Sequence, residues 1–287
     1  MDERRGLLYV VATPIGNLGD LTERARKVLT DVDLIAAEDT RETRRLLAHC
    51  GITTRLIAYH DYNEATAAAR LIETLESGLS VALVSDAGTP LISDPGYDLV
   101  VAARARGLTV VPVPGANAAI CALSAAGLPS DRFLFLGFPP RTGAQRRVWL
   151  EAVAREPGTL ILYESGRRAA LTLADAATVL GETRRAVVGR ELTKRFETFL
   201  SGTVRELADR LTAEDEQRLG EMVLLIEGLP DAGSADQVEQ ERVLRVLAAE
   251  LPLRRAAGLA ARLTGGRKND LYRMGIELGL GQGLLKE

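Results

Sequence analysis

The segment from Ser80 to Gly96 reads SVALVSDAGTPLISDPG, and it decides how the rest of the chain is interpreted. Its apolar start is typical of a strand buried on both faces of a parallel sheet. A short loop follows that holds Asp86 and Asp94 together with two glycines and two prolines. Since open α/β sheets bind ligands at the carboxyl ends of their strands, we expect this loop to bind a ligand. Two successive turns that merely cross the surface are the alternative.

Strand and helix patterns alternate on both sides of this segment. Further buried strands are predicted at residues 7–12, 34–37, 56–59 and 108–113. Helical periodicity between them predicts helices, including one over 116–126 that ends at Gly127. Such alternation implies parallel strands with right-handed crossovers. We therefore expect an N-terminal α/β domain over residues 1–128.

The second half of the chain has a different pattern after the segment 128–131, which is typical of a hinge. Two apolar strands close to residues 191–196 favour antiparallel pairing. We expect an α+β domain over residues 129–230, with a long helix near 143–155. A polar linker follows, and three helical segments over 238–287 complete the predicted architecture.

The composition is that of an ordinary globular protein, with 46% apolar residues and a net charge of −3. No apolar run approaches the ~18 residues of a membrane helix, and the N-terminus lacks a signal-peptide core. Cys50 and Cys121 are predicted to be free buried thiols, and a cytoplasmic location is expected. His49 and His60 have no partners at ligand spacing, so no metal site is predicted.

Basic residues are concentrated near the C-terminus. Between Leu253 and Gly275 a single acid, Asp270, stands among six basic side chains: Arg254, Arg255, Arg262, Arg267, Lys268 and Arg273. A nucleic acid responds to such local patches, so the slightly negative total charge does not exclude an RNA partner.

Two further loops follow predicted strands of the first domain. The loop over residues 12–20 holds Gly16 and Gly19, which would allow the backbone to approach a ligand; a tight turn is the alternative. The loop over residues 113–118 leads into a helix whose N-terminus would offer free amide groups, unless its small residues serve close packing.

Charged side chains gather at three other strand ends. Glu38 and Asp39 follow a short strand and could contact a substrate or cap the next helix. The stretch over residues 163–168 places one acid beside two arginines, and residues 190–197 are strongly charged. A solvated hairpin tip would explain the last stretch, although Arg190 and Glu191 directly continue an apolar strand.

Taken together, these stretches resemble the tetrapyrrole methylase superfamily of S-adenosylmethionine-dependent methyltransferases, and within it the ribosomal RNA branch. The matching stretches occur in the family's order at residues 12–20, 37–41, 84–96, 114–118, 163–165, 190–197 and 220–223. Two departures stand out. The stretch over residues 13–17 replaces the G-x-G-P-G-D loop of tetrapyrrole enzymes, and Gly166 and Arg167 stand where most relatives in the RNA branch have proline and histidine.

The resemblance implies a two-domain methyltransferase fold, in a homodimer, with S-adenosylmethionine bound between the domains. It also implies that the enzyme methylates the ribose 2′-oxygen of a cytidine in 16S rRNA of the 30S subunit. Nine residues would line the cofactor pocket by motif alignment: Ile15, Asp86, Ala87, Gly88, Thr89, Asn117, Ala118, Tyr163 and Glu164.

Methyl transfer requires that the 2′-oxygen be aligned and that its proton be accepted. Glu191, Lys194 and Asp39 are the candidates for this catalytic role. Arg190 or Arg195 would hold the RNA backbone, and Arg254, Arg255, Arg267 and Lys268 would bind further phosphates. Because only 4% of residues are aromatic, recognition should depend more on RNA shape and charge than on stacking.

Two other functions fit parts of the pattern. Methylation of a tetrapyrrole precursor or of diphthine is disfavoured by the basic C-terminal segment and by the loop over residues 13–17. A ribosome-assembly factor that holds the cofactor as a structural ligand would bind it without methylating RNA.

Overall fold

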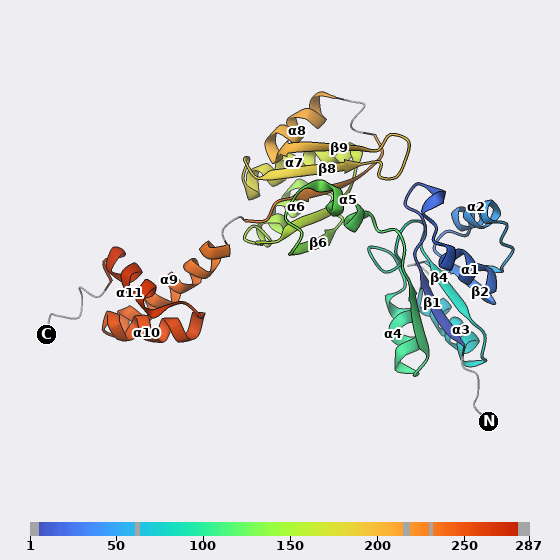
Figure 1. Cartoon of the computed structure of the whole chain (residues 1–287), viewed down its shortest axis with the longest axis horizontal. Coiled ribbons are helices and arrows are strands. Elements are labelled where there is room, and N and C mark those ends of the chain that lie inside the picture. Colours follow the sequence, from blue (N-terminus) through green and yellow to red (C-terminus); the bar gives the residue numbers. More distant parts are fainter. Residues whose placement is uncertain (1–5, 61–63, 215–218, 230–231, 281–287) are drawn as a thin grey trace. The chain divides into compact units, whose positions relative to one another are not determined.

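A computed structural model describes residues 6–60, 64–214, 219–229 and 232–280 of the 287-residue chain. The chain divides into two compact units (Figure 1). Unit 1 comprises Met1–Val153 and Gly158–Glu227, and unit 2 comprises Ala154–Pro157 and Gly228–Glu287.

Unit 1 contains two five-stranded sheets, and the first of them is wholly parallel, as predicted. Its strand order is β3-β2-β4-β1-β5. The strands are β1 (Leu7–Val11), β2 (Leu34–Ala37), β3 (Leu56–Ala58), β4 (Val81–Val84) and β5 (Thr109–Val113). Strand β4 is central and all four of its residues are buried, which explains why its sequence is continuously apolar.

Helices cover both faces of this sheet. They are α1 (Glu23–Asp31), α2 (Thr40–Cys50), α3 (Glu64–Glu76) and α4 (Tyr97–Ala105), and a short 3-10 turn, η1 (Leu18–Asp20), follows β1. Leu83 of β4 packs in the core with Leu71 and Leu99 from α3 and α4. The next residue, Val84, packs in a separate core with Leu29 of α1. Successive residues of β4 therefore point to opposite faces of the sheet, each of which is covered by helices. The strand ends at Val84, where the loop over residues 85–96 begins.

The second sheet has the order β6-β7-β10-β8-β9. Its strands are β6 (Phe133–Gly137), β7 (Thr159–Ser165), β8 (Arg185–Arg190), β9 (Thr198–Thr203) and β10 (Glu221–Ile226). Strands β6 and β7 are parallel, and the other neighbouring pairs are antiparallel. The antiparallel pairing predicted around residues 191–196 is thus confirmed. Because β10 runs against β7, the start of β10 lies beside the end of β7.

Helix α5 (Ala118–Ala126) precedes the predicted hinge but packs against this second sheet. Its Ala122 and Leu123 share a core with Ile161, Val187 and Val223. The other helices of this part are α6 (Gly143–Glu151), α7 (Gly166–Leu180) and α8 (Val204–Ala213). Helices α7 and α8 pack together against the opposite side of the sheet (Figure 1).

Unit 2 is helical. It contains α9 (Ala232–Glu250), α10 (Leu253–Thr264) and α11 (Lys268–Glu277). Leu244, Ala256, Ala260 and Leu271 form the centre of its core. Helix α10 ends at Gly265, whose φ of +74° is the left-handed conformation that glycine adopts without a steric cost.

The structure corrects several predictions of detail. Helix α6 ends at Glu151 instead of near residue 155, and α5 begins at Ala118 instead of residue 116. Cys50 and Cys121 are free thiols, as expected, but both are partly exposed and not buried. Among the helices that the structure describes, none is long and apolar enough to span a membrane.

Candidate functional site

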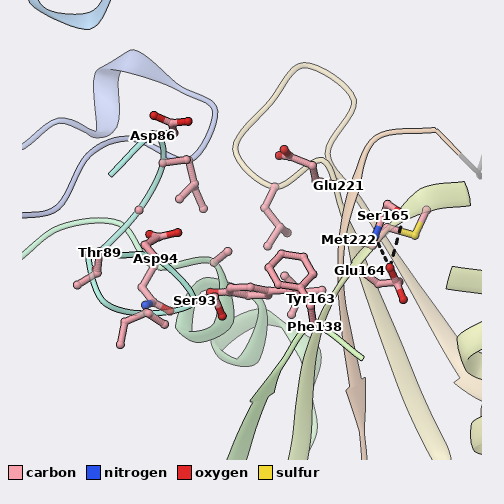
Figure 2. A pocket seen from close by; sticks show the side chains of 18 of the residues that line it. Asp86, Thr89, Ser93, Asp94, Phe138, Tyr163, Glu164, Ser165, Glu221 and Met222 are labelled. Atoms are coloured by element: carbon pink, nitrogen blue, oxygen red, sulfur yellow. Dashed lines mark hydrogen bonds between the residues drawn. The ribbon is translucent and has the colours of Figure 1, made fainter. Parts of the chain in front are cut away.

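Loops from both sheets of unit 1 line one cavity of about 400 Å³ (Figure 2). The first sheet contributes the loops after β1, β4 and β5 and the end of β2. The second contributes the ends of β6 and β7, the loop between β8 and β9, and the start of β10. A volume of this size lies within the range of ~300–1,000 Å³ typical of small-molecule sites.

All the residues predicted to bind cofactor lie in the lining of this cavity. They are Ile15, Asp86, Ala87, Gly88, Thr89, Asn117, Ala118, Tyr163 and Glu164. Of the three catalytic candidates, only Lys194 joins them, and neither Glu191 nor Asp39 belongs to the lining.

The loop after β4, residues 85–96, is held in place by backbone bonds to its neighbours. The amides of Thr13 and Gly88 donate to each other's carbonyl oxygens, at 2.9 and 3.1 Å, which ties this loop to the end of β1. The Thr89 hydroxyl donates to the carbonyl oxygen of Ala116 at 3.0 Å, which ties it to the loop after β5. Leu91 and Ser93 adopt positive φ values of 72° and 70°, so the loop keeps a shape that few side chains favour.

The Asp86 side chain braces this loop against the end of β2. Its carboxylate accepts a hydrogen bond from the Asp39 amide at 2.9 Å, and the Asp86 amide donates to the Glu38 carboxylate at 3.2 Å. Burial raises the pKa of Asp86 above its usual value. Asp86 therefore lines the cavity while its carboxylate is bonded to protein backbone.

The N-terminus of α5 differs from the prediction that it would offer free amide groups. The Ala119 amide donates to the Tyr163 hydroxyl at 3.2 Å, and the Ile120 amide donates to the Asn117 side chain at 3.2 Å. Asn117 thus caps the helix, and both amides are engaged before any ligand arrives.

Aromatic rings form the apolar part of the lining. The Tyr163 ring lies edge-on to Phe138, with ring centres 5.6 Å apart (Figure 2). It also lies edge-on to Phe135, with ring centres 4.9 Å apart. Burial raises the pKa of Tyr163, so its hydroxyl keeps its proton at neutral pH. Since that hydroxyl also bonds the Ala119 amide, the ring is fixed at both ends.

Glu164 is buried, with only 2% of its surface exposed, and its carboxylate oxygens bond to residues of β7 and α7. They accept hydrogen bonds from the Ser165 amide and the Thr172 hydroxyl, each at 2.8 Å, and pair with Arg168 at 3.2 Å. Arg168 in turn donates to the carbonyl oxygen of Pro139 at 2.8 Å. This network fixes the segment that directly follows Phe138.

The loop over residues 191–197, between β8 and β9, is organised by charge. The Lys194 ammonium donates to the carboxylates of Glu191 and Glu221, both at 2.9 Å. The Glu221 amide also donates to Glu191, at 2.9 Å, beside Gly220, where a Cβ would overlap the Glu191 carboxylate. The first-sheet loop approaches here too, because a Cβ at Gly16 would overlap the Lys194 side chain.

These contacts set the protonation states of the pair. Burial opposes the charge of Glu191, but the Glu221 amide and the Lys194 ammonium outweigh it and hold the pKa of Glu191 below its usual value. Burial likewise opposes the charge of Lys194, and the two carboxylates outweigh it and raise its pKa. At neutral pH, Glu191 is ionised and Lys194 is protonated.

Asp39 has a local structural role. Its carboxylate accepts the Arg41 amide at 2.8 Å as the N-cap of α2, and it pairs with the Arg41 guanidinium at 2.6 Å. The Arg41 side chain and amide together lower the pKa of Asp39 to about 2. A carboxylate this acidic is a weak proton acceptor at neutral pH.

The predicted RNA-binding residues fall into two groups. In unit 1, the Arg190 guanidinium donates to the carbonyl oxygens of Leu219 at 2.9 Å and Phe196 at 3.4 Å, while Arg195 lies exposed over the Phe196 ring. In unit 2, the exposed residues lie on the first turn of α10 and at the start of α11: Arg254, Arg255, Arg267 and Lys268.

The lining also contains residues that were not predicted as site residues: Glu38, Ile92, Ser93, Asp94, Phe138, Ser165, Leu192, Glu221, Met222 and Val223. Three of them, Glu38, Ser165 and Leu192, stand next to predicted site residues in the sequence. The start of β10 joins the site because β10 pairs with β7 from the opposite direction. The stretch over residues 220–223 was among those that match the family, although none of its residues was predicted as a site residue.

Acidic side chains dominate the charge of the lining. Among the described residues that line it, one side chain is cationic, Lys194, and five are carboxylates: Glu38, Asp86, Asp94, Glu164 and Glu221. Arg168 balances Glu164, and Lys194 balances Glu221. A small ligand with a positive charge suits such a site.

This fold is that of a known class of methyltransferases. Residues 7–208 match the family described as Tetrapyrrole (Corrin/Porphyrin) Methylases, and the chain belongs to that family. Residues 234–279, in unit 2, match a second family, described as the RsmI C-terminal HTH domain.

Two curated relatives match nearly the whole length of the chain. The chain is 53% identical to Ribosomal RNA small subunit methyltransferase I of Pseudomonas aeruginosa, over 95% of this chain and 97% of that protein. It is 52% identical to the protein of the same name from Escherichia coli O157:H7, over 96% of each chain. The resemblance to the ribosomal RNA branch is thereby confirmed.

Solved structures share the fold at low sequence identity. A diphthine synthase superposes with a TM-score of 0.61 at 16% identity, covering 77% of this chain and 90% of that chain. A cobalt precorrin-4 methyltransferase superposes with a TM-score of 0.57 at 17% identity, covering 76% and 94%.

Proposed function

We propose that this protein transfers a methyl group from S-adenosylmethionine to the ribose 2′-oxygen of a cytidine in 16S rRNA of the 30S subunit. One observation carries the proposal: loops from two sheets, distant in sequence, bring all the predicted cofactor residues into one acid-lined cavity. The near-full-length similarity to small-subunit rRNA methyltransferases supports the RNA substrate. The ribose oxygen and the cytidine come from the sequence resemblance.

The residues of the cavity fit the cofactor. When bound, S-adenosylmethionine supplies an electrophilic methyl group on a sulfonium cation. The surplus of carboxylates in the lining favours that positive charge. The rings of Phe138 and Tyr163 and the side chain of Ile15 provide apolar surface for the uncharged parts.

The loop after β4 and the loop before α5 would bind and orient the cofactor. The Thr13–Gly88 backbone pair and the Thr89–Ala116 bond hold these loops rigidly. Alignment of the reacting atoms supplies much of the rate in a displacement of this kind, so rigid loops suit the reaction.

The ribose 2′-oxygen that accepts the methyl group would lie on the side of the cavity formed by residues 191–197 and the start of β10. Lys194 is protonated and faces the cavity, so we assign it the task of holding an acceptor oxygen by donating a hydrogen bond. The Glu221 carboxylate bonds the same ammonium and lines the same cavity, and it is placed to accept the 2′-hydroxyl proton. Glu191 orients Lys194 from behind.

Phosphate contacts would come from basic side chains outside the cavity. Arg254, Arg255, Arg267 and Lys268 are exposed on a helical unit that matches a helix-turn-helix family, where helix starts commonly meet phosphates. Such contacts would add affinity with little sequence preference. A homodimer and a cytoplasmic location complete the proposal.

The direct test uses 30S subunits from cells that lack the corresponding modification. Purified protein and S-adenosylmethionine with a tritiated methyl group should label 16S rRNA at one cytidine, and the linkage on its 3′ side should resist alkali. The absence of label in small-subunit RNA would overturn the proposal. Label on the base would overturn the assignment to the ribose, and cofactor binding without label would indicate an assembly factor.

A further inference from the structure

The loop over residues 191–197 ends in an exposed aromatic side chain. Phe196 has 64% of its surface exposed, and the Arg195 guanidinium lies over its ring, 5.5 Å from the ring centre. An aromatic face with a guanidinium is the combination that stacks on nucleobases and neutralises neighbouring phosphates.

The loop holds Phe196 in place through its backbone. The Phe196 carbonyl oxygen accepts hydrogen bonds from the Thr198 hydroxyl at 3.0 Å and from Arg190 at 3.4 Å. The Glu197 carboxylate accepts a hydrogen bond from the Thr193 amide at 2.6 Å, and the Glu197 amide donates to the carbonyl oxygen of Lys194 at 3.1 Å. A rigid loop thus keeps an apolar ring in solvent, where burial against a partner would stabilise it.

The aromatic ring is also close to the cavity along the chain. Leu192 and Lys194 line the cavity, and Phe196 follows Lys194 by two residues, which span at most about 7 Å. A nucleotide that contacts Phe196 would therefore neighbour one whose ribose reaches Lys194.

We propose that Phe196, with Arg195, forms a stacking platform for an unpaired base adjacent to the methylated nucleotide. The occupant is single-stranded RNA, because the platform combines a flat apolar face with a cation beside the methyl-transfer cavity. The inference rests on the proposed function. It adds stacking to the expectation that recognition depends more on RNA shape and charge than on stacking.

The test compares Phe196→Ala, Phe196→Leu and Phe196→Trp in the full-length protein. The control is Tyr97→Ala, which removes another exposed ring, at the start of α4 and outside the cavity lining. One assay measures the KM for unmodified 30S subunits in methyl transfer. The other measures binding of a short single-stranded RNA with 2-aminopurine next to a cytidine, since stacking quenches its fluorescence.

The alanine and leucine variants should each raise the KM and the RNA Kd about tenfold, because they remove the stacked ring; tenfold corresponds to ~1.4 kcal/mol. The tryptophan variant should bind and quench like the wild type, and the Tyr97 control should be unchanged. Affinity for S-adenosylmethionine should stay the same in every variant.

Three results would overturn the inference. The first is a leucine variant with the KM and RNA Kd of the wild type, and the second is an equal rise of both constants in the Tyr97 control. The third is a change from dimer to monomer on Phe196→Ala, which would show that a second copy of the chain covers the ring. If the wild type methylates no RNA, the proposed function fails, and the quenching assay still decides whether Phe196 stacks on a base.

Discussion

The loop after β4 and the loop between β8 and β9 form facing parts of one cavity, yet they are built differently. Each contains two non-glycine residues with positive φ: Leu91 and Ser93 in the first, Glu191 and Thr193 in the second. The first loop follows a fully buried strand and is fixed by backbone bonds, such as those between Thr13 and Gly88. The second is fixed by an ionic cluster around Lys194.

The difference indicates a division of tasks. A loop that is fixed through its backbone can hold a bulky ligand in one orientation. A loop fixed through an ammonium and two carboxylates presents groups that can donate and accept protons. We therefore expect changes in the first loop to affect cofactor binding, and changes in the second to affect methyl transfer.

The largest effect should come from the buried guanidinium of Arg146, which supports the second sheet's part of the cavity. It is 4% exposed and donates to Asp175 at 2.7 Å and to the Pro140 carbonyl oxygen at 3.3 Å. Arg146→Ala should lower the free energy of unfolding in urea by about 3 kcal/mol, because it leaves a carboxylate partly buried with less compensation.

Arg147 provides the matched control for that measurement, because it pairs with the same carboxylate at 2.8 Å from a half-exposed position. Arg147→Ala should cost less than about 1 kcal/mol. Equal losses in the two variants would show that burial of the Arg146 guanidinium does not determine the size of its effect.

The next effect concerns Lys194. Lys194→Ala should reduce methyl transfer to 30S subunits about 100-fold at saturating cofactor, because the acceptor oxygen loses a charged donor. Binding of S-adenosylmethionine, measured by calorimetry, should change little. Lys27→Ala removes an exposed lysine of α1 and serves as the control. Undiminished turnover would show that Lys194 has no part in the mechanism. A loss confined to cofactor affinity would show that the loop between β8 and β9 binds cofactor, as the loop after β4 is expected to do.

Asp86 tests the first loop. Asp86→Ala should weaken S-adenosylmethionine binding about tenfold, because the Asp39 amide loses its acceptor and the loop loses its brace, at a cost of ~1.4 kcal/mol. Asp86→Asn keeps an acceptor oxygen and should bind nearly as tightly as the wild type. If the asparagine variant is as weak as the alanine variant, the carboxylate charge itself contacts the cofactor.

The smallest effect is the pH dependence contributed by Asp39. Its pKa falls from 3.8 to about 2 in the folded protein, so its stabilising effect is complete above about pH 4 and is lost toward pH 2. Asp39→Asn should lower the melting temperature slightly at pH 7, and this difference should shrink below pH 4. A difference that stays constant down to pH 2 would contradict the capping role.

Much of the fold could be predicted because local patterns determine it. The buried run that ends at Val84 predicts a parallel strand, and Gly51 and Gly127 mark helix ends, since both adopt positive φ. The start of α5 lies two residues later than predicted, because Asn117 caps the helix and the helix proper begins at Ala118. Packing of α5 on the second sheet depends on tertiary contacts that no local pattern encodes.

The sequence predicted which residues lie at the site better than it predicted the role of each residue. The cavity gathers strand ends, and strand ends are recognisable in the sequence. The roles depend on partners that are distant along the chain, as Glu191 is from Gly220 and Glu221. Asp39 is the opposite case, because its partner Arg41 is adjacent and a capping role was already one of the two interpretations.

The four left-handed residues of the two loops have a consequence for the entropy of binding. Such conformations cost ~1–3 kcal/mol each, and the surrounding hydrogen bonds offset that cost when the chain folds. The loops therefore lose their conformational freedom before any ligand arrives. The ligand meets surfaces that are already ordered, so little of its interaction energy is consumed in ordering them.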